Sequence, residues 1–143
     1  MELERYRQAH KFLHNKAVRE IRAGKKEGHW IWFELPQAYG LEQSEASNYY
    51  GLRGLEEARA YLEDKTLKSD LYEICEELLK KDDLKEVLGE LDAKKCWSSM
   101  TLFAMASEKE DSIFHRVIKK FYGSRYDDDT FEVLHKYYKG DII

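Results

Sequence analysis

Backbone breakers are scarce in this chain, which has one proline and eight glycines in 143 residues. Mostly apolar side chains instead recur at spacings of three and four, the first such stretch being Leu3, Tyr6, His10, Leu13, Ala17 and Ile21. This spacing places side chains on one face of an α-helix. A chain of short strands would need many more turn residues. The sequence therefore predicts an all-α fold.

The periodic segments predict a compact domain of about seven or eight helices around a buried central helix. The central helix is expected in the region 97–106, where Thr101 is the only polar residue after Ser99. A length of 143 residues fits one domain, residues 1–143. The aromatic segment 28–36 is too short for periodicity to decide between a short helix and an extended plug.

The charge distribution argues against a general nucleic-acid-binding protein. The net charge is −4, whereas such domains usually carry a basic excess. Residues 1–27 contain eight basic and four acidic side chains, and residues 28–93 contain seven and sixteen. Weak nucleic-acid binding through the N-terminal helix stays open as an alternative, although a solvated helix face is the favoured interpretation.

Several features indicate a cytoplasmic protein without a membrane segment. The longest near-apolar run, residues 100–106, is far shorter than the span of about 20 residues that a bilayer requires. The N-terminal residues contain no apolar signal core. The two cysteines, Cys75 and Cys96, lie in apolar periodic stretches and are expected to be reduced core residues.

The first candidate site is aromatic. His29, Trp30, Trp32 and Phe33 place four rings in five residues, and Gln37 follows the only proline. Tryptophan combines apolar area with one polar group, which suits ring-binding pockets and interfaces. A core plug between helices is the competing interpretation, and the sequence does not decide between them.

The second candidate site is polar. Two lysines, Lys94 and Lys95, precede two serines, Ser98 and Ser99, at the head of the apolar segment. If a helix begins at either serine, its free backbone N–H groups would join the lysines in binding an anion. Asp92 is an equally good N-cap, however, and a helix that begins there places both serines in its interior.

Metal chemistry is not predicted. His10 and His14 are spaced i, i+4, which can bring two imidazoles to one metal ion on a helix. No third ligand is evident near them in the sequence. We therefore predict no metal site and no cofactor.

Several motifs together resemble one family. Residues 29–37 resemble its "HWxWFxxPQ" signature, residues 49–62 its "FYGIxSLEEAxAYL" stretch, residues 92–103 its "DxxKxxSSMTLF" motif, and residues 122–130 its "YGGxxDxxT" end. The family is the domain of unknown function numbered 1810, whose bacterial members are sometimes mislabelled calpastatin-like. The resemblance extends over nearly the whole chain in the family's order.

The resemblance implies a compact, all-helical single domain, and it implies no activity because the family has none established. Two departures are visible. Residues 64–68 replace the "HPxLG" that usually follows the "AYL" stretch, so that its histidine and proline are missing. Trp97 stands where an arginine often precedes the two serines, which removes one possible anion contact.

These features together suggest a pocket for a ring-bearing anionic small molecule, such as a nucleotide derivative. The ring is expected to stack on Trp30, Trp32 or Phe33, and Tyr50 is a further ligand-binding residue. The charged group is expected to be held by Lys95, Ser98 and Ser99, and the orientation to be set by His29 and Gln37. His29 is the candidate general acid or base, because the unperturbed pKa of histidine lies near neutral pH. Whether the protein is an enzyme is left open. The alternative is a non-catalytic protein-interaction or scaffold domain.

Overall fold

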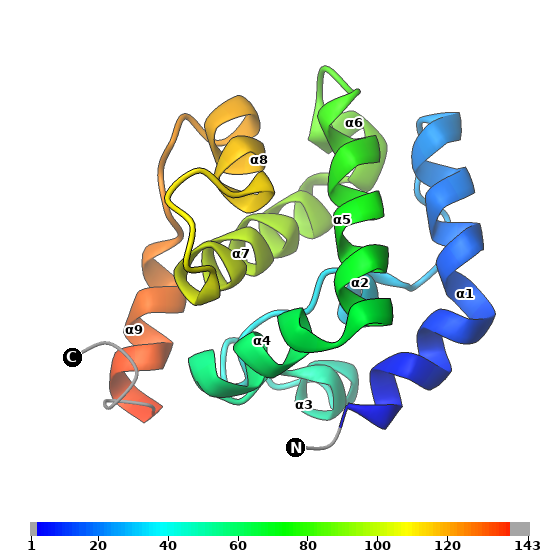
Figure 1. The fold of residues 1–143 in the computed structure, drawn as a ribbon. Coiled ribbons are helices and arrows are strands. Elements are labelled where there is room, and N and C mark those ends of the chain that lie inside the picture. Colours follow the sequence, from blue (N-terminus) through cyan, green and yellow to red (C-terminus); the bar gives the residue numbers. More distant parts are fainter. Residues whose placement is uncertain (1–2, 138–143) are drawn as a thin grey trace.

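The computed structural model describes residues 3–137, which form nine helices and no strand (Figure 1). The all-α prediction is confirmed, and the other residues of the predicted 1–143 domain lie outside this description. Segment 28–36 contains a one-turn helix, Ile31–Glu34, which raises the number of helices above the seven or eight expected. The helices are α1 Glu4–Ala23, α2 Ile31–Glu34, α3 Glu45–Tyr50, α4 Gly54–Glu63, α5 Lys65–Leu79, α6 Leu84–Leu88, α7 Glu90–Ala106, α8 Ile113–Phe121 and α9 Asp128–Tyr137.

Helix α7 lies at the centre of the packing. It contacts α2, α4, α6, α8 and α9, and Figure 1 shows it crossing the middle of the molecule between α8 and α4. Its side chains are buried on several sides, and Cys96, Met100 and Phe103 have no exposed surface. A helix this apolar around its circumference is stable only when other elements surround it.

Helices α1 and α5 pack side by side along one flank of the molecule (Figure 1). Tyr6, Ala17 and Ile21 of α1 are fully buried, as the spacing predicted. The prediction for Leu13 is wrong, because it is 39% exposed while His14 is buried in its place. The inward stripe of α1 therefore carries two histidines, His10 and His14, and their polar ring nitrogens require partners inside the protein.

Side-chain caps account for where several helices begin. Ser44, Asp64, Asp83 and Ser112 each accept a hydrogen bond from a backbone N–H in the first turn of α3, α5, α6 and α8. Such caps stabilise a helix by about 1 kcal/mol each. Asp64 stands in the segment that departs from the family's "HPxLG" pattern, so the substituted residues begin α5 directly.

Among the described residues, no helix is both long enough and apolar enough to cross a membrane.

Candidate functional site

The residue at which α7 begins determines whether the predicted anion site can form. Helix α7 begins at Glu90, after Gly89, whose φ of +86° suits glycine. Ser98 and Ser99 therefore lie in the middle of the helix, as the alternative start at Asp92 also implied, and the condition for an anion site at a helix N-terminus is not met. Their backbone N–H groups are already used in the helix, so they are not free to bind an anion.

The two serines have structural surroundings instead. Ser98 Oγ donates to Asp127 Oδ2 at 2.6 Å and has a weaker contact of 3.3 Å with the carbonyl oxygen of Lys94. Ser99 is fully buried, and its hydroxyl has no hydrogen-bond partner within the part of the chain described. Ser98 also borders a cavity, which is described below.

The aromatic residues separate into core and surface. Trp30 is 2% exposed and Phe33 is 5% exposed, so both belong to the hydrophobic core. The indole N–H of Trp30 donates to Glu20 Oε1 at 2.8 Å. Trp32 is partly buried, and the ammonium nitrogen of Lys95 lies 5.2 Å from the centre of its ring. His29 is exposed.

A cavity of about 260 Å³, which we call the α7 groove, lies beside these residues. It is bounded by α7, by the loop after α2 and by the start of α9, with the lining residues Gln37, Leu41, Glu42, Leu91, Lys94, Lys95, Ser98, Asp127 and Asp129. Three of the predicted site residues, Gln37, Lys95 and Ser98, thus meet in one cavity. Trp32, Gln37 and Tyr50 border an adjoining hollow of about 10 Å³, which is too small for a ligand.

The charges in the α7 groove have both signs. Lys95 has two long ion pairs, 3.9 Å to Glu42 and 3.7 Å to Asp92. Asp127 is 2% exposed, and its carboxylate accepts hydrogen bonds from Ser98, from the Thr130 hydroxyl and from the backbone N–H of Asp129. Asp127 therefore caps α9 and is occupied by internal partners, unlike the surface charges of the groove.

The position of the family's arginine is occupied by a packing residue. Trp97 stacks on Tyr122 with ring centres 5.7 Å apart, and its indole N–H donates to the carbonyl oxygen of Arg125 at 2.7 Å. Trp97 thus ties α7 to the segment that follows α8. It does not line the α7 groove.

A second polar cluster lies between α1, α2 and α5, and sequence reasoning did not find it. We call it the histidine–carboxylate cluster, and it consists of His10, His14, Glu34, Asp70 and Glu73. His14 Nδ1 lies 2.6 Å from Glu34 Oε1, and His14 Nε2 lies 2.7 Å from Glu73 Oε1. His10 Nδ1 lies 3.0 Å from Asp70 Oδ2, and His10 Nε2 lies 2.6 Å from the carbonyl oxygen of Phe33.

The cluster favours protonated histidines. Burial lowers the pKa of His14, but the hydrogen bond and charge of Glu34, with Glu73 and Asp70, outweigh it and raise the pKa to about 9. Burial likewise lowers the pKa of His10, and the hydrogen bond to Asp70 and the charge of Glu34 raise it overall. Opposite charges nearby stabilise the charged form of an imidazole.

The sequence signal for this cluster was only partial. The i, i+4 spacing of His10 and His14 was visible, but Glu34 lies 20 residues beyond His14, inside the aromatic motif. Asp70 and Glu73 are spaced i, i+3 on α5, as expected for two residues on one helix face. Only the packing of α1 against α2 and α5 brings the five residues together.

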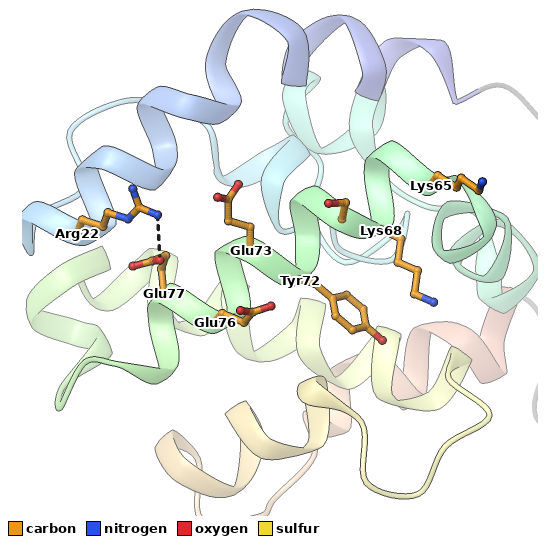
Figure 2. A pocket seen from close by; sticks show the side chains of 8 residues that line it. Arg22, Lys65, Lys68, Tyr72, Glu73, Glu76 and Glu77 are labelled. Atoms are coloured by element: carbon orange, nitrogen blue, oxygen red, sulfur yellow. Dashed lines mark hydrogen bonds and ion pairs between the residues drawn. The ribbon is translucent and has the colours of Figure 1, made fainter.

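A wider groove of about 600 Å³ runs along α5 beside the cluster (Figure 2). Glu73 and Arg22 line it, and Arg22 donates to Glu77 at 3.2 Å. Figure 2 shows Glu73 extending from α5 toward α1. Glu73 and Asp70, the carboxylates of the cluster that come from α5, are therefore partly exposed to solvent.

The fold defines an all-helical single-domain protein with two polar sites, the α7 groove and the histidine–carboxylate cluster. The chain belongs to the family described as "Protein of unknown function (DUF1810)", whose model matches residues 1–134. It is similar to the crystal structure of the conserved hypothetical protein Rv1873 from Mycobacterium tuberculosis, with 37% identity and a TM-score of 0.87. That match covers 92% of this chain and 94% of the other. None of the curated proteins compared matches the chain.

Proposed function

We propose that this protein binds a small ring-bearing anion, such as a nucleotide derivative, in the α7 groove. The observation that carries the proposal is the position of Lys95, which borders the groove and lies over the ring of Trp32. Its two ion pairs are long, so a ligand anion at hydrogen-bond distance would be a closer partner than either carboxylate. Lys94 adds a second, exposed ammonium group.

Gln37 lines both the groove and the small hollow of Trp32 and Tyr50, so the ring of the ligand would lie in the groove on the Gln37 side, next to that hollow and not inside it. Trp30 and Phe33 are excluded from stacking because both are buried in the core. A ring that carries N–H donors would suit the acidic side chains of the groove, since carboxylates accept such bonds. The volume of about 260 Å³ lies below the usual range for drug-sized ligands, which limits the ligand to about a mononucleotide.

The proposal is for binding and assigns no reaction. No histidine, including the candidate acid or base His29, is among the described residues that line the groove. The cytoplasmic location proposed from the sequence agrees with two free, buried cysteines. Burial raises the pKa of the Cys96 thiol to about 12, which leaves it unreactive.

The proposal is tested by titrating the full chain with a panel of nucleoside monophosphates and aryl phosphates, followed by calorimetry and thermal shift. Lys95→Ala is expected to weaken binding of the best ligand at least tenfold. Lys68→Ala is the matched control, because Lys68 lies over Tyr72 at 5.6 Å but borders other cavities. No ligand in the panel, or equal affinities of the two variants, would refute the proposal.

A protein-interaction function is the second candidate. Trp30 and Phe33 are core residues, as this alternative expects, and Phe12 of α1 is 74% exposed beside the partly exposed Leu13. Exposed aromatic side chains are enriched at interfaces. Light scattering of the wild type and of Phe12→Ser tests self-association through this face. A wild-type oligomer that Phe12→Ser dissociates would support the function, and a monomer in both samples would count against it.

Nucleic-acid binding through α1 is not proposed. Arg5 pairs with Glu57 at 3.0 Å, and Arg7 pairs with Asp64 at 2.7 Å. Farther along, Lys26 pairs with Asp92 at 2.7 Å. Positive charge that is neutralised by neighbouring carboxylates contributes little to phosphate binding.

A further inference from the structure

The histidine–carboxylate cluster is independent of the α7 groove, since none of its five residues lines that groove. Its two imidazole rings are stacked nearly parallel, with centres 5.8 Å apart and planes 14° apart. Each ring lies between oxygen atoms from α2 on its inner side and carboxylates of α5 on its outer side. All four ring nitrogens therefore face acceptors.

The outer carboxylates orient the rings. His10 Nδ1 lies 3.0 Å from Asp70, and His14 Nε2 lies 2.7 Å from Glu73. Histidines that bind metal ions generally donate their other ring N–H to a carboxylate or carbonyl in this way. The inner nitrogens, His10 Nε2 and His14 Nδ1, also face acceptors, the Phe33 carbonyl and Glu34, so each gains a lone pair for a metal ion only when the ion displaces its proton.

The inner side contains a carboxylate oxygen without a partner. Glu34 is fully buried, and its Oε1 lies 2.6 Å from His14 Nδ1. Its Oε2 has no hydrogen-bond partner in residues 3–137 and lies 3.8 Å from His10 Nε2. A buried carboxylate oxygen left unsatisfied is costly, and a cation beside it removes that cost.

We propose that His10, His14 and Glu34 bind a divalent transition-metal ion, with Asp70 and Glu73 as the carboxylates that orient the two histidines. The three ligand side chains each offer one atom, and these atoms lie within 4.8 Å of one another. Two imidazoles and a carboxylate are ligands that Zn²⁺ and related ions accept.

The surroundings of the three ligands supply further oxygen atoms, and the cluster is partly exposed on its outer side. The Phe33 carbonyl lies 2.6 Å from His10 Nε2, and the Tyr61 hydroxyl lies 3.3 Å from the same nitrogen. On the outer side, the side chains of Asp70 and Glu73 are 20% and 44% exposed. Glu73 also lines the groove of Figure 2, so the outer edge of the cluster borders that groove.

The test is a titration of the chelator-treated full chain with Co²⁺ and with Zn²⁺. Visible absorption reports Co²⁺ coordination, and calorimetry gives the stoichiometry and affinity for Zn²⁺. We expect one ion per chain, a higher thermal midpoint with metal, and an affinity at least a hundredfold lower in Glu34→Gln. His135→Ala is the control, because His135 is exposed and outside the cluster, and it is expected to bind as the wild type does.

Measurements on the wild type alone can already overturn the proposal. Absence of Co²⁺ absorption and of any metal-dependent thermal shift in the wild type would overturn the proposal, leaving protons as the occupants of the inner nitrogens. Equal metal affinity of folded Glu34→Gln and wild type would overturn it as well. If Glu34→Gln fails to fold, Asp70→Asn replaces it, with an expected loss of about 10- to 100-fold in affinity.

Discussion

Replacement of Asp127 by alanine is expected to destabilise the protein strongly, although the residue borders a cavity and carries a charge. The Asp127 carboxylate accepts from Ser98 Oγ at 2.6 Å, Thr130 Oγ1 at 2.8 Å and the Asp129 N–H at 3.2 Å. Thr130 is fully buried and does not line the α7 groove, so water does not readily replace its lost acceptor, whereas Ser98 borders the groove.

The magnitude follows from these three partners. An unsatisfied buried hydroxyl costs about 1–3 kcal/mol, and this applies fully to Thr130. Ser98 retains its contact with the Lys94 carbonyl oxygen at 3.3 Å, so its loss is smaller. Loss of the cap of α9 adds about 1 kcal/mol. We therefore expect Asp127→Ala to lower the free energy of unfolding by about 3–5 kcal/mol.

The assay is urea unfolding followed by circular dichroism, with Asp128→Ala as the matched control. Asp128 is the exposed neighbour, and its replacement makes the same change in net charge. A loss below about 1 kcal/mol in Asp127→Ala, or equal losses in the two variants, would refute the assignment of Asp127 as an internal acceptor. In that case Asp127 would be available to a ligand in the α7 groove.

Three further predictions concern other contacts. Trp30→Phe removes the indole donor to Glu20 and is expected to cost about 1–3 kcal/mol, measured by urea unfolding. In chelator-treated protein, folding raises the pKa of His14 from 6.5 to about 9. The contribution of protonated His14 to the free energy of unfolding is therefore fully present below about pH 6.5 and is lost as the pH rises through about 9. Unfolding between pH 6 and 10 should show a loss of about 3 kcal/mol that His14→Gln removes, and an unchanged pH profile in this variant would contradict it. Gly51→Ala is expected to lower the free energy of unfolding by about 1–3 kcal/mol, because the added Cβ would lie 2.7 Å from the carbonyl oxygen of Ser47. Wild-type stability of this variant in thermal unfolding would exclude the clash.

Helical spacing and capping residues made most of the fold predictable. The inward positions Tyr6, Ala17 and Ile21 and the caps Ser44 and Ser112 depend on neighbours within one helix, which a sequence displays directly. The start of α7 was not predictable in this way. Asp92 and both serines had cap chemistry, whereas the helix begins after Gly89, where the left-handed backbone separates α6 from α7.

The candidate sites were less predictable, because they depend on contacts between distant segments. His14 was passed over in favour of Leu13, since an apolar residue is the usual choice for an inward position. The carboxylates that make His14 acceptable inside the protein come from α2 and α5. Likewise, the aromatic motif did not reveal that Trp30 would be fully enclosed in the core and Trp32 only partly buried beside Lys95.

The α7 groove has a wall that belongs to the last described helix. Asp127 and Asp129 at the start of α9 form that wall, and the Ser98–Asp127 hydrogen bond joins it to α7. A ligand in the groove would touch both helices, so its binding free energy would add to the docking of α9 on the rest of the molecule. Resistance of α9 to limited proteolysis would then rise with ligand concentration, and the cleavage pattern would report occupancy.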